Sequence, residues 1–123
     1  MFGSQKLMAF VAVRDLGRAR NFYRDSLGLG LVGQDEFALV FDAGGTMLRV
    51  VRVEEPVSAQ YTVLGWEVKD IIEAAESLRK AKVSLERYPG IEQDQLGIWK
   101  SPSGARVAWF KDPDGNTLSI TQF

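Results

Sequence analysis

Two short stretches with the same pattern decide the fold: residues 13–16 (VRDL) and residues 68–71 (VKDI), which begin 55 positions apart. Val13 ends an apolar run that is typical of a buried strand, and Val68 ends a second segment that reads as a strand. An aspartate follows, and its carboxylate can accept hydrogen bonds from the free backbone N–H groups of a first helical turn. Each stretch therefore predicts a junction between a strand and a helix, and the chain contains this junction twice.

The segments around the two junctions follow one order, β-α-β-β-β. The first half predicts a helix that begins at Asp15 and ends at Gly28, between strands over 7–13, 29–33, 36–42 and 46–53. The second half predicts a helix that begins at Asp70, between strands over 61–68, 83–88, 105–111 and 117–122. Arg49 matches Ser119 at an offset of 70, so the second half carries about 15 extra residues, which we expect in a loop around 89–104.

This internal repeat predicts an α+β fold built from two βαβββ modules, at about 5–55 and 60–123, within a single domain over 1–123. Each helix can cover only one face of the strands in its module. We therefore expect the two modules to pair into a curved mixed sheet that forms a cup, with the helices on its outer face. A ligand would sit in the concave inner face.

The composition removes several kinds of chemistry, because the chain contains no histidine and no cysteine. It cannot form a Ser-His-Asp or Cys-His nucleophile, or a zinc or ferrous site of the usual composition. A net charge of −1 predicts no attraction to nucleic acid or to an anionic membrane. With no disulfide framework, no signal pattern and no apolar run long enough to cross a bilayer, we expect a cytoplasmic protein.

Three motifs carry a resemblance to a known family: residues 13–16, residues 21–29 (NFYRDSLGL) and residues 110–118 (FKDPDGNTL). They resemble the signatures of the vicinal oxygen chelate superfamily, which includes glyoxalase I, the extradiol dioxygenases, fosfomycin-resistance enzymes and the bleomycin-resistance proteins. The resemblance runs from about Leu7 to Gln122 and implies the paired-module fold. It is unspecific for activity. By analogy with the bleomycin-resistance proteins, it also implies a homodimer.

Enzymes of that superfamily hold a divalent metal through one side chain from each of four strands, usually His, Glu or Gln. The resemblance places these positions at Met8, Arg49, Val63 and Ser119. A thioether, a guanidinium, an isopropyl group and a hydroxyl do not make a tight divalent-metal site. Arg49 would also put a permanent positive charge where the cation belongs. We therefore predict no metal and no cofactor.

Strand alternation predicts which side chains line the cup. The candidate ligand-binding residues are Met8, Phe10, Met47, Arg49, Val63, Trp99 and Ser119, with Trp109 as a second aromatic surface. Arg49 can either pair with Glu67 across the cup or bind a carboxylate or phosphate of a ligand. Glu67 is the one candidate for a general base, although a neighbouring arginine would instead keep it ionised.

Two functions from different classes remain open at this point. The chain is either a metal-free protein that binds a small aromatic or anionic molecule, or a lyase, isomerase or dioxygenase that uses Glu67 or unconventional ligands. A third reading is a structural or regulatory module with a vestigial cavity. The sequence does not decide whether the chain is an enzyme.

Overall fold

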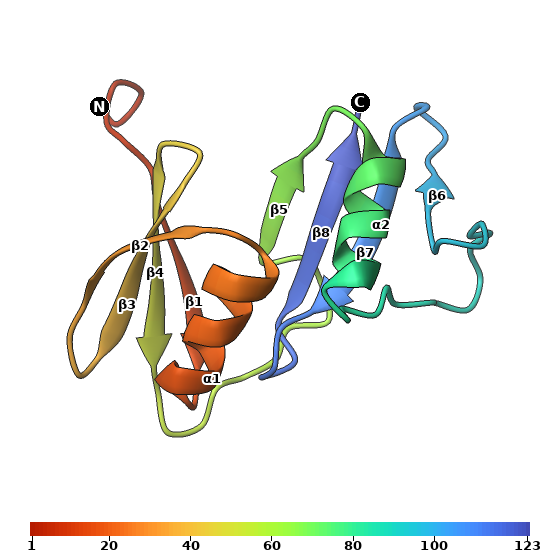
Figure 1. Cartoon of the computed structure of the whole chain (residues 1–123). Helices are drawn as coiled ribbons and strands as arrows, with labels where there is room; N and C mark the ends of the chain where they lie inside the picture. Colours follow the sequence, from red (N-terminus) through yellow and green to blue (C-terminus); the bar gives the residue numbers. More distant parts are fainter. The chain divides into compact units, whose positions relative to one another are not determined.

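The computed structural model describes residues 1–123. The chain forms two compact units, Met1–Val57 and Ser58–Phe123. Each unit holds one four-stranded mixed sheet and one helical segment, in the predicted order β-α-β-β-β (Figure 1). The α+β class and the two-module organisation are therefore confirmed. That the two units form a single domain with a common cup stays a prediction.

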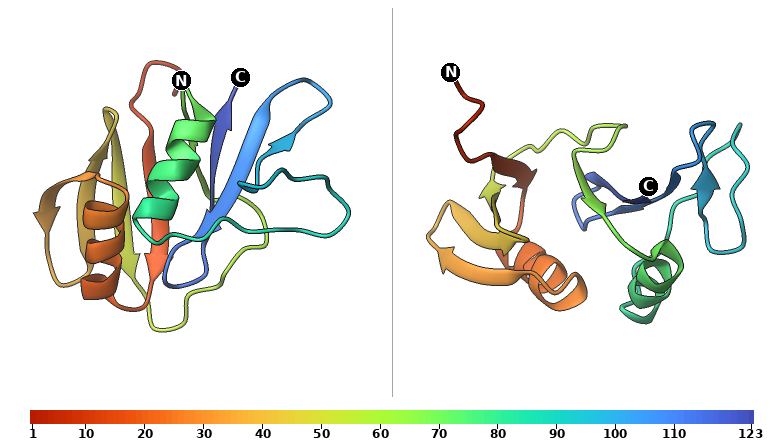
Figure 2. Two further views of the ribbon diagram at one scale, coloured as in Figure 1. Left: turned by 45° about the vertical axis from the view of Figure 1, so that its right-hand side comes forward. Right: turned by 90° about the horizontal axis from the view of Figure 1, so that it is seen from above.

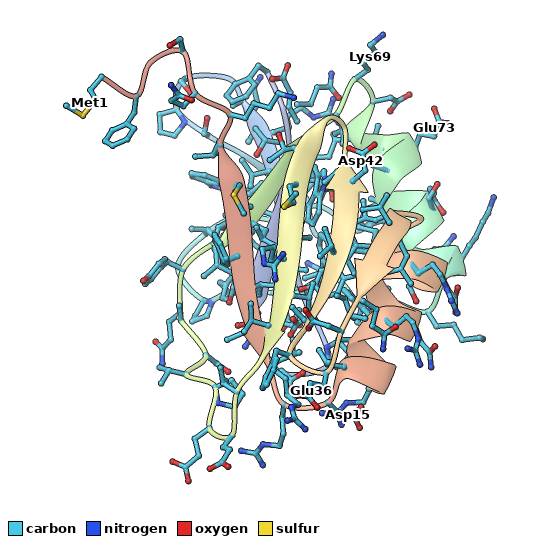
Figure 3. All side chains as sticks on the ribbon, turned by 90° about the vertical axis from the view of Figure 1, so that its left-hand side faces the viewer. Met1, Asp15, Glu36, Asp42, Lys69 and Glu73 are labelled. Atoms are coloured by element: carbon cyan, nitrogen blue, oxygen red, sulfur yellow. The ribbon has the colours of Figure 1, made fainter.

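The first unit contains β1 (Met8–Val13), α1 (Leu16–Arg20), the π-helical segment η1 (Asn21–Ser26), β2 (Gly30–Gln34), β3 (Ala38–Ala43) and β4 (Thr46–Arg52). Its strand order is β1-β4-β3-β2, with β1 parallel to β4 and the other pairs antiparallel. Figure 3 shows Asp42 at one end of the β3–β4 hairpin, and Asp15 and Glu36 at the opposite end of the sheet.

The second unit contains β5 (Leu64–Glu67), α2 (Ile71–Lys80), β6 (Trp99–Lys100), β7 (Arg106–Lys111) and β8 (Thr117–Gln122). Its strand order is β5-β8-β7-β6, with β5 parallel to β8. In each unit the helix lies on one face of that unit's own sheet (Figure 2). The opposite face of each sheet is called its helix-free face below.

The predicted helix starts are confirmed in atomic detail. The Asp15 carboxylate accepts a hydrogen bond from the backbone N–H of Arg18, and that of Asp70 accepts one from Glu73, each at 3.1 Å. Gly28 follows the first helical segment with a φ of +76°, a left-handed conformation that favours glycine. From Asn21 onward the helix widens, so that Leu27 N donates to Phe22 O, and Tyr23 is fully buried.

The repeat also holds in the strand register. Ala9 lies opposite Leu48 in the first unit, and Leu64 lies opposite Leu118 in the second. These are equivalent pairs after the shifts of 55 and 70 positions found in the sequence. The two parallel strand pairs are therefore built alike. Equivalent residues lie on the same face of their own sheet, either toward or away from the helix of their own module.

One predicted strand is wrong. Residues 83–88 form no strand, and only Leu85 makes an isolated bridge, to Phe110. The edge strand next to β7 is instead Trp99–Lys100, so Trp99 lies on a strand and not in a loop. Glu86 N still donates to Trp109 O of β7 at 2.7 Å. Beyond this contact Gln93 takes the backbone groups that a longer strand would use, accepting a hydrogen bond from Tyr88 N and donating one to Glu86 O.

The core of each unit lies between its sheet and its helix. The fully or nearly fully buried apolar side chains include Val11, Val13, Tyr23, Phe41, Leu48 and Val50 in the first unit and Ile71, Ala75, Phe110, Leu118 and Ile120 in the second. Alternation places eight strand residues under the helices. Six are buried (Val11, Val13, Leu48, Val50, Leu118 and Ile120), and Leu64 and Trp66 are half-buried. No helix is both long and apolar enough to cross a membrane.

Candidate functional site

The helix-free face of the second unit gathers aromatic side chains from two strands. Ala108 and Phe110 of β7 are buried on the helix side, so Trp109, which lies between them, points to the helix-free face. Trp109 lies opposite Ser119 of β8 in the strand register, and Trp99 of β6 lies opposite Val107. Alternation along β7 therefore brings both tryptophans to the same face.

These two indoles and one phenol form what we call the aromatic cluster: Tyr88, Trp99 and Trp109. The ring centroids of Trp99 and Trp109 are 5.9 Å apart, with their planes tilted by 33°. Tyr88 packs edge-on against Trp109, with centroids 5.5 Å apart and planes at 85°. All three side chains are half-buried, so part of each ring stays accessible. Such a surface can stack a planar ligand.

Tyr88 adds a polar group to the aromatic cluster. Burial, and to a lesser degree the nearby Glu86 carboxylate, raises the pKa of the Tyr88 phenol above its ordinary value. A phenol with a raised pKa keeps its proton at neutral pH. Tyr88 can therefore donate a hydrogen bond to a ligand.

Next to the tryptophans, the helix-free face becomes polar. Ser119 is only 5% exposed, and its hydroxyl lies beside Gly65 of β5, where an added Cβ would approach Oγ to 3.0 Å. Because Gly65 has no Cβ, there is room beside it for the Ser119 hydroxyl. Val63 precedes β5, donating its N–H to Thr117 O at 2.9 Å, while Glu67 is exposed at the end of β5, opposite Thr121.

The helix-free face of the first unit holds the other predicted residues. Met8 lies opposite Met47, and Phe10 lies opposite Arg49, in the parallel β1–β4 register. Met8, Phe10 and Met47 are 45%, 57% and 41% exposed, which is unusual for apolar side chains inside a sheet. The four residues therefore form one accessible patch, largely apolar, around a single arginine.

Arg49 is half-buried, and its guanidinium makes no hydrogen bond or ion pair in the structure. The positive charge of Arg49 acts on the carboxylate of Asp35. This carboxylate accepts hydrogen bonds from the backbone N–H groups of Phe37 at 2.8 Å and Ala38 at 2.9 Å. These two hydrogen bonds, and more weakly the charge of Arg49, lower the pKa of Asp35. The guanidinium of Arg49 thus keeps its donors available for an anion.

Each unit has a hollow beside these residues, open to solvent. In the first unit a cavity of about 690 Å³ is lined by Ser4, Gln5, Lys6, Leu7, Met8, Val32, Phe41, Asp42, Gly45 and Met47. In the second unit a cavity of about 420 Å³ is lined by Glu92, Gln93, Asp94, Ile98, Trp99, Lys100 and Arg106. The predicted residues Met8, Met47 and Trp99 therefore border sizeable hollows.

The positions that hold a metal in the related enzymes do not fit one here. Met8 and Arg49 lie on the first unit, and Val63 and Ser119 on the second. A thioether, a guanidinium, an alkyl group and a hydroxyl supply no carboxylate or imidazole. No group of three or more acidic side chains lies close enough together to hold a metal ion elsewhere in the structure.

Two site residues were missed in the sequence. Tyr88 was assigned to a strand that does not form, and Gln93 was seen only as part of a loop. No periodicity marks either residue, because both are placed by contacts within an irregular segment. The predicted pairing of Arg49 with Glu67 joins residues of different units and stays a prediction.

Comparison with known proteins agrees with this architecture. The model of the Glyoxalase/Bleomycin resistance protein/Dioxygenase superfamily matches residues 6–120. The uncharacterized protein YraH of Bacillus subtilis (strain 168) is 30% identical in an alignment that covers 88% of this chain and 90% of YraH.

Two solved structures share the fold at lower identity. Lactoylglutathione lyase from Agrobacterium tumefaciens has a TM-score of 0.76 at 19% identity, covering 98% of this chain and 95% of the lyase. TnmS3, an antibiotic binding protein from Streptomyces sp. CB03234, has a TM-score of 0.72 at 22% identity, covering 99% of this chain and 98% of TnmS3. The match to the family model over nearly the whole chain shows that this protein belongs to the Glyoxalase/Bleomycin resistance protein/Dioxygenase superfamily.

Proposed function

We propose that the chain is a metal-free binding protein for a small planar aromatic molecule that carries an anionic group. The observation that carries this proposal is the aromatic cluster on the helix-free face of the second unit. Its rings are close enough to form one surface and remain partly accessible. Stacking on aromatic rings stabilises planar ligands beyond the area that they bury.

The anionic part of the proposal rests on Arg49. Its guanidinium has no protein partner and lies among apolar side chains, opposite Phe10 on one strand and Val40 on the other. A carboxylate or phosphate on the ligand would supply the missing hydrogen-bond acceptors. That one ligand reaches both units in a common cup is part of the proposal.

A binding role also agrees with the four metal positions of the family, which here carry Met8, Arg49, Val63 and Ser119. The fold is compatible with binding without chemistry, since one structural neighbour is described as an antibiotic binding protein. By itself this likeness supports the fold alone, so the argument depends on the side chains of this chain.

The test combines metal analysis with calorimetry. We expect the purified protein to contain no stoichiometric metal and to bind 2-naphthoate, a planar aromatic carboxylate. Trp99→Ala and Trp109→Ala should each weaken binding by about 10-fold, since aromatic contacts contribute on the order of 1 kcal/mol beyond their burial. Trp66→Phe is the matched control, because Trp66 stacks against the buried ring of Phe110.

Two results would contradict this proposal. One is stoichiometric, tightly bound Zn, Ni, Mn or Fe in the purified protein. The other is 2-naphthoate binding that neither tryptophan variant changes.

The alternative function is a lyase, isomerase or dioxygenase reaction of the same superfamily. The observation in its favour is Glu67, an accessible carboxylate on the same helix-free face as Ser119 and the aromatic cluster. If a substrate is found, Glu67→Gln should abolish most of its turnover while leaving its binding intact. Unchanged turnover in Glu67→Gln would exclude Glu67 as the base.

We also propose a homodimer and a cytoplasmic location. Sedimentation velocity should show a species of twice the 13.7 kDa chain mass. A single species at the chain mass across micromolar concentrations would rule out the dimer. Fractionation of the producing cells should recover the protein with cytoplasmic markers.

A further inference from the structure

The segment between α2 and β6 carries one ring of the aromatic cluster and leads directly into β6, which carries a second. Tyr88 stands near its beginning, and Trp99 follows its end on β6. Neither ring is placed by a long strand, since β6 has two residues and residues 83–88 form none. The backbone contacts to β7 beside these rings are few: Glu86 N donates to Trp109 O at 2.7 Å, and Trp99 lies opposite Val107.

Gln93 lies between them, and its side chain joins the two ends of the segment. Its Oε1 accepts a hydrogen bond from Tyr88 N at 2.8 Å. Its Nε2 donates to Glu86 O at 2.9 Å and to Gly97 O at 2.8 Å. The backbone of Gln93 also forms an isolated antiparallel bridge with Trp99. One residue thus contacts the backbone at or beside both rings.

Other contacts in the segment hold its turn and not its rings. The Asp94 carboxylate accepts the N–H groups of Leu96 and Ile98, each at 2.9 Å. Arg87 donates to the backbone oxygens of Asp94 and Gln95. These bonds close the tip of the segment. The amide of Gln93 alone bonds to the backbone N–H of Tyr88, so its role differs from theirs.

The chemistry of these contacts requires an amide. The site needs one acceptor, for an N–H group, and two donors, for two carbonyl oxygens, and glutamine offers both on one planar group. A carboxylate of the same shape would accept from Tyr88 but would turn an oxygen toward two carbonyl oxygens. Glutamate at this position should therefore disrupt the arrangement almost as much as alanine does.

We propose that Gln93 is the positioning residue of the aromatic cluster: its amide holds Tyr88 and Trp99 against Trp109 and so prepares the surface for a planar aromatic ligand. The ligand part of this inference rests on the proposed function, whereas the ring geometry does not. A preformed surface binds more tightly because less conformational entropy is lost when the ligand arrives.

The experiment compares Gln93→Ala and Gln93→Glu with Gln95→Ala. Gln95 lies on the same segment, is exposed, and makes no side-chain hydrogen bond in the structure. The first readout needs no ligand: two indoles 5.9 Å apart should give an exciton couplet in circular dichroism. Trp99→Phe should abolish the couplet and Trp66→Phe should not. We expect both Gln93 variants to lose most of it and Gln95→Ala to keep it.

The second readout is the affinity for 2-naphthoate by calorimetry. We expect about a 10-fold loss in both Gln93 variants and no change in Gln95→Ala, as for the loss of preorganisation in a binding site. If Gln93→Ala no longer folds, as judged by urea unfolding, Gln93→Met replaces it, because methionine keeps the volume and lacks the hydrogen bonds.

The outcomes separate the two proposals. A couplet and an affinity that survive in the Gln93 variants would overturn the role of Gln93. If the wild-type protein does not bind 2-naphthoate, the proposed function fails, and the couplet still decides whether Gln93 positions the rings.

Discussion

Arg49 is the residue whose surroundings most constrain a ligand. It stands on the central strand β4 between Phe10 of β1 and Val40 of β3, neither of which has a side-chain hydrogen-bond acceptor. A half-buried guanidinium without a partner is disfavoured, because it has lost some of its water and gained no acceptor. An anionic ligand group would remove this cost.

We predict that Arg49→Ala weakens binding of 2-naphthoate by roughly 10- to 100-fold, the equivalent of about 1.5–3 kcal/mol for a hydrogen bond to a charged group. Binding of the neutral 2-naphthamide should change little. Calorimetry on both compounds measures the difference. Arg52→Ala is the control, since Arg52 is an exposed arginine at the end of the same strand. Equal losses for both compounds would contradict the role assigned to Arg49.

Asp35 gives a prediction about pH. Its pKa is lowered by the backbone N–H groups of Phe37 and Ala38, so the ionised form stabilises the folded state. This stabilisation is present above the unfolded pKa of about 4 and is lost as the pH falls through the lower, folded pKa. Asp35→Asn should therefore be less stable than wild type at pH 7, and the gap should narrow below about pH 4.

Urea unfolding from pH 7 downward measures this gap. The neighbouring exposed residue Glu36 supplies the control, Glu36→Gln. A gap between Asp35→Asn and wild type that stays constant with pH would show that the carboxylate of Asp35 is not the cause.

At the scale of elements, the β7–β8 turn is held by side-chain as well as backbone hydrogen bonds. The turn between β7 and β8 is organised by Asp112, which is 5% exposed. Its Oδ1 accepts from Asp114 N and Asn116 N, each at 2.9 Å, and its Oδ2 accepts from the Asn116 side chain at 2.8 Å. Gly115 has a φ of +85°, which the turn requires.

We predict that Asp112→Ala lowers the free energy of unfolding by about 3 kcal/mol, because it leaves several buried donors without an acceptor. The helix caps make a weaker contribution: Asp15→Ala and Asp70→Ala should each cost about 1 kcal/mol. Urea unfolding of the three variants gives the comparison. A cost for Asp112→Ala no larger than that of the cap variants would contradict this account of the turn.

At the scale of the whole molecule, the two modules repeat one plan and differ in what they expose. The first helix-free face is largely apolar around Arg49, with Met8, Phe10 and Met47 accessible. The second carries the aromatic cluster and the buried hydroxyl of Ser119.

If one ligand uses both faces, as proposed above, one 2-naphthoate should bind per chain, with a single affinity that both Arg49→Ala and Trp99→Ala reduce. Calorimetric stoichiometry measures this directly. Two classes of site, each sensitive to only one of the two variants, would mean that the faces bind separately.

Much of this protein follows from the sequence by itself. The helix caps at Asp15 and Asp70 and the helix end at Gly28 were predicted, because each depends on residues a few positions apart, and the repeat was predicted because two such junctions share one pattern. Alternation also predicted which side chains of β1, β4, β5 and β8 lie on the helix-free face. That Met8, Arg49, Val63 and Ser119 stand at the metal positions of the family stays a prediction from the repeat and the family resemblance.

The tertiary structure alone decided the aromatic cluster. Residues 83–88 have the composition of a strand, yet they pair with β7 only at the Leu85–Phe110 bridge and the hydrogen bond from Glu86 N to Trp109 O. The Gln93 amide takes Glu86 O and Tyr88 N, and β6 pairs with β7 further along the same edge. Competition between one side chain and a strand partner for the same backbone groups leaves no periodic pattern, so only the folded chain shows which of them wins.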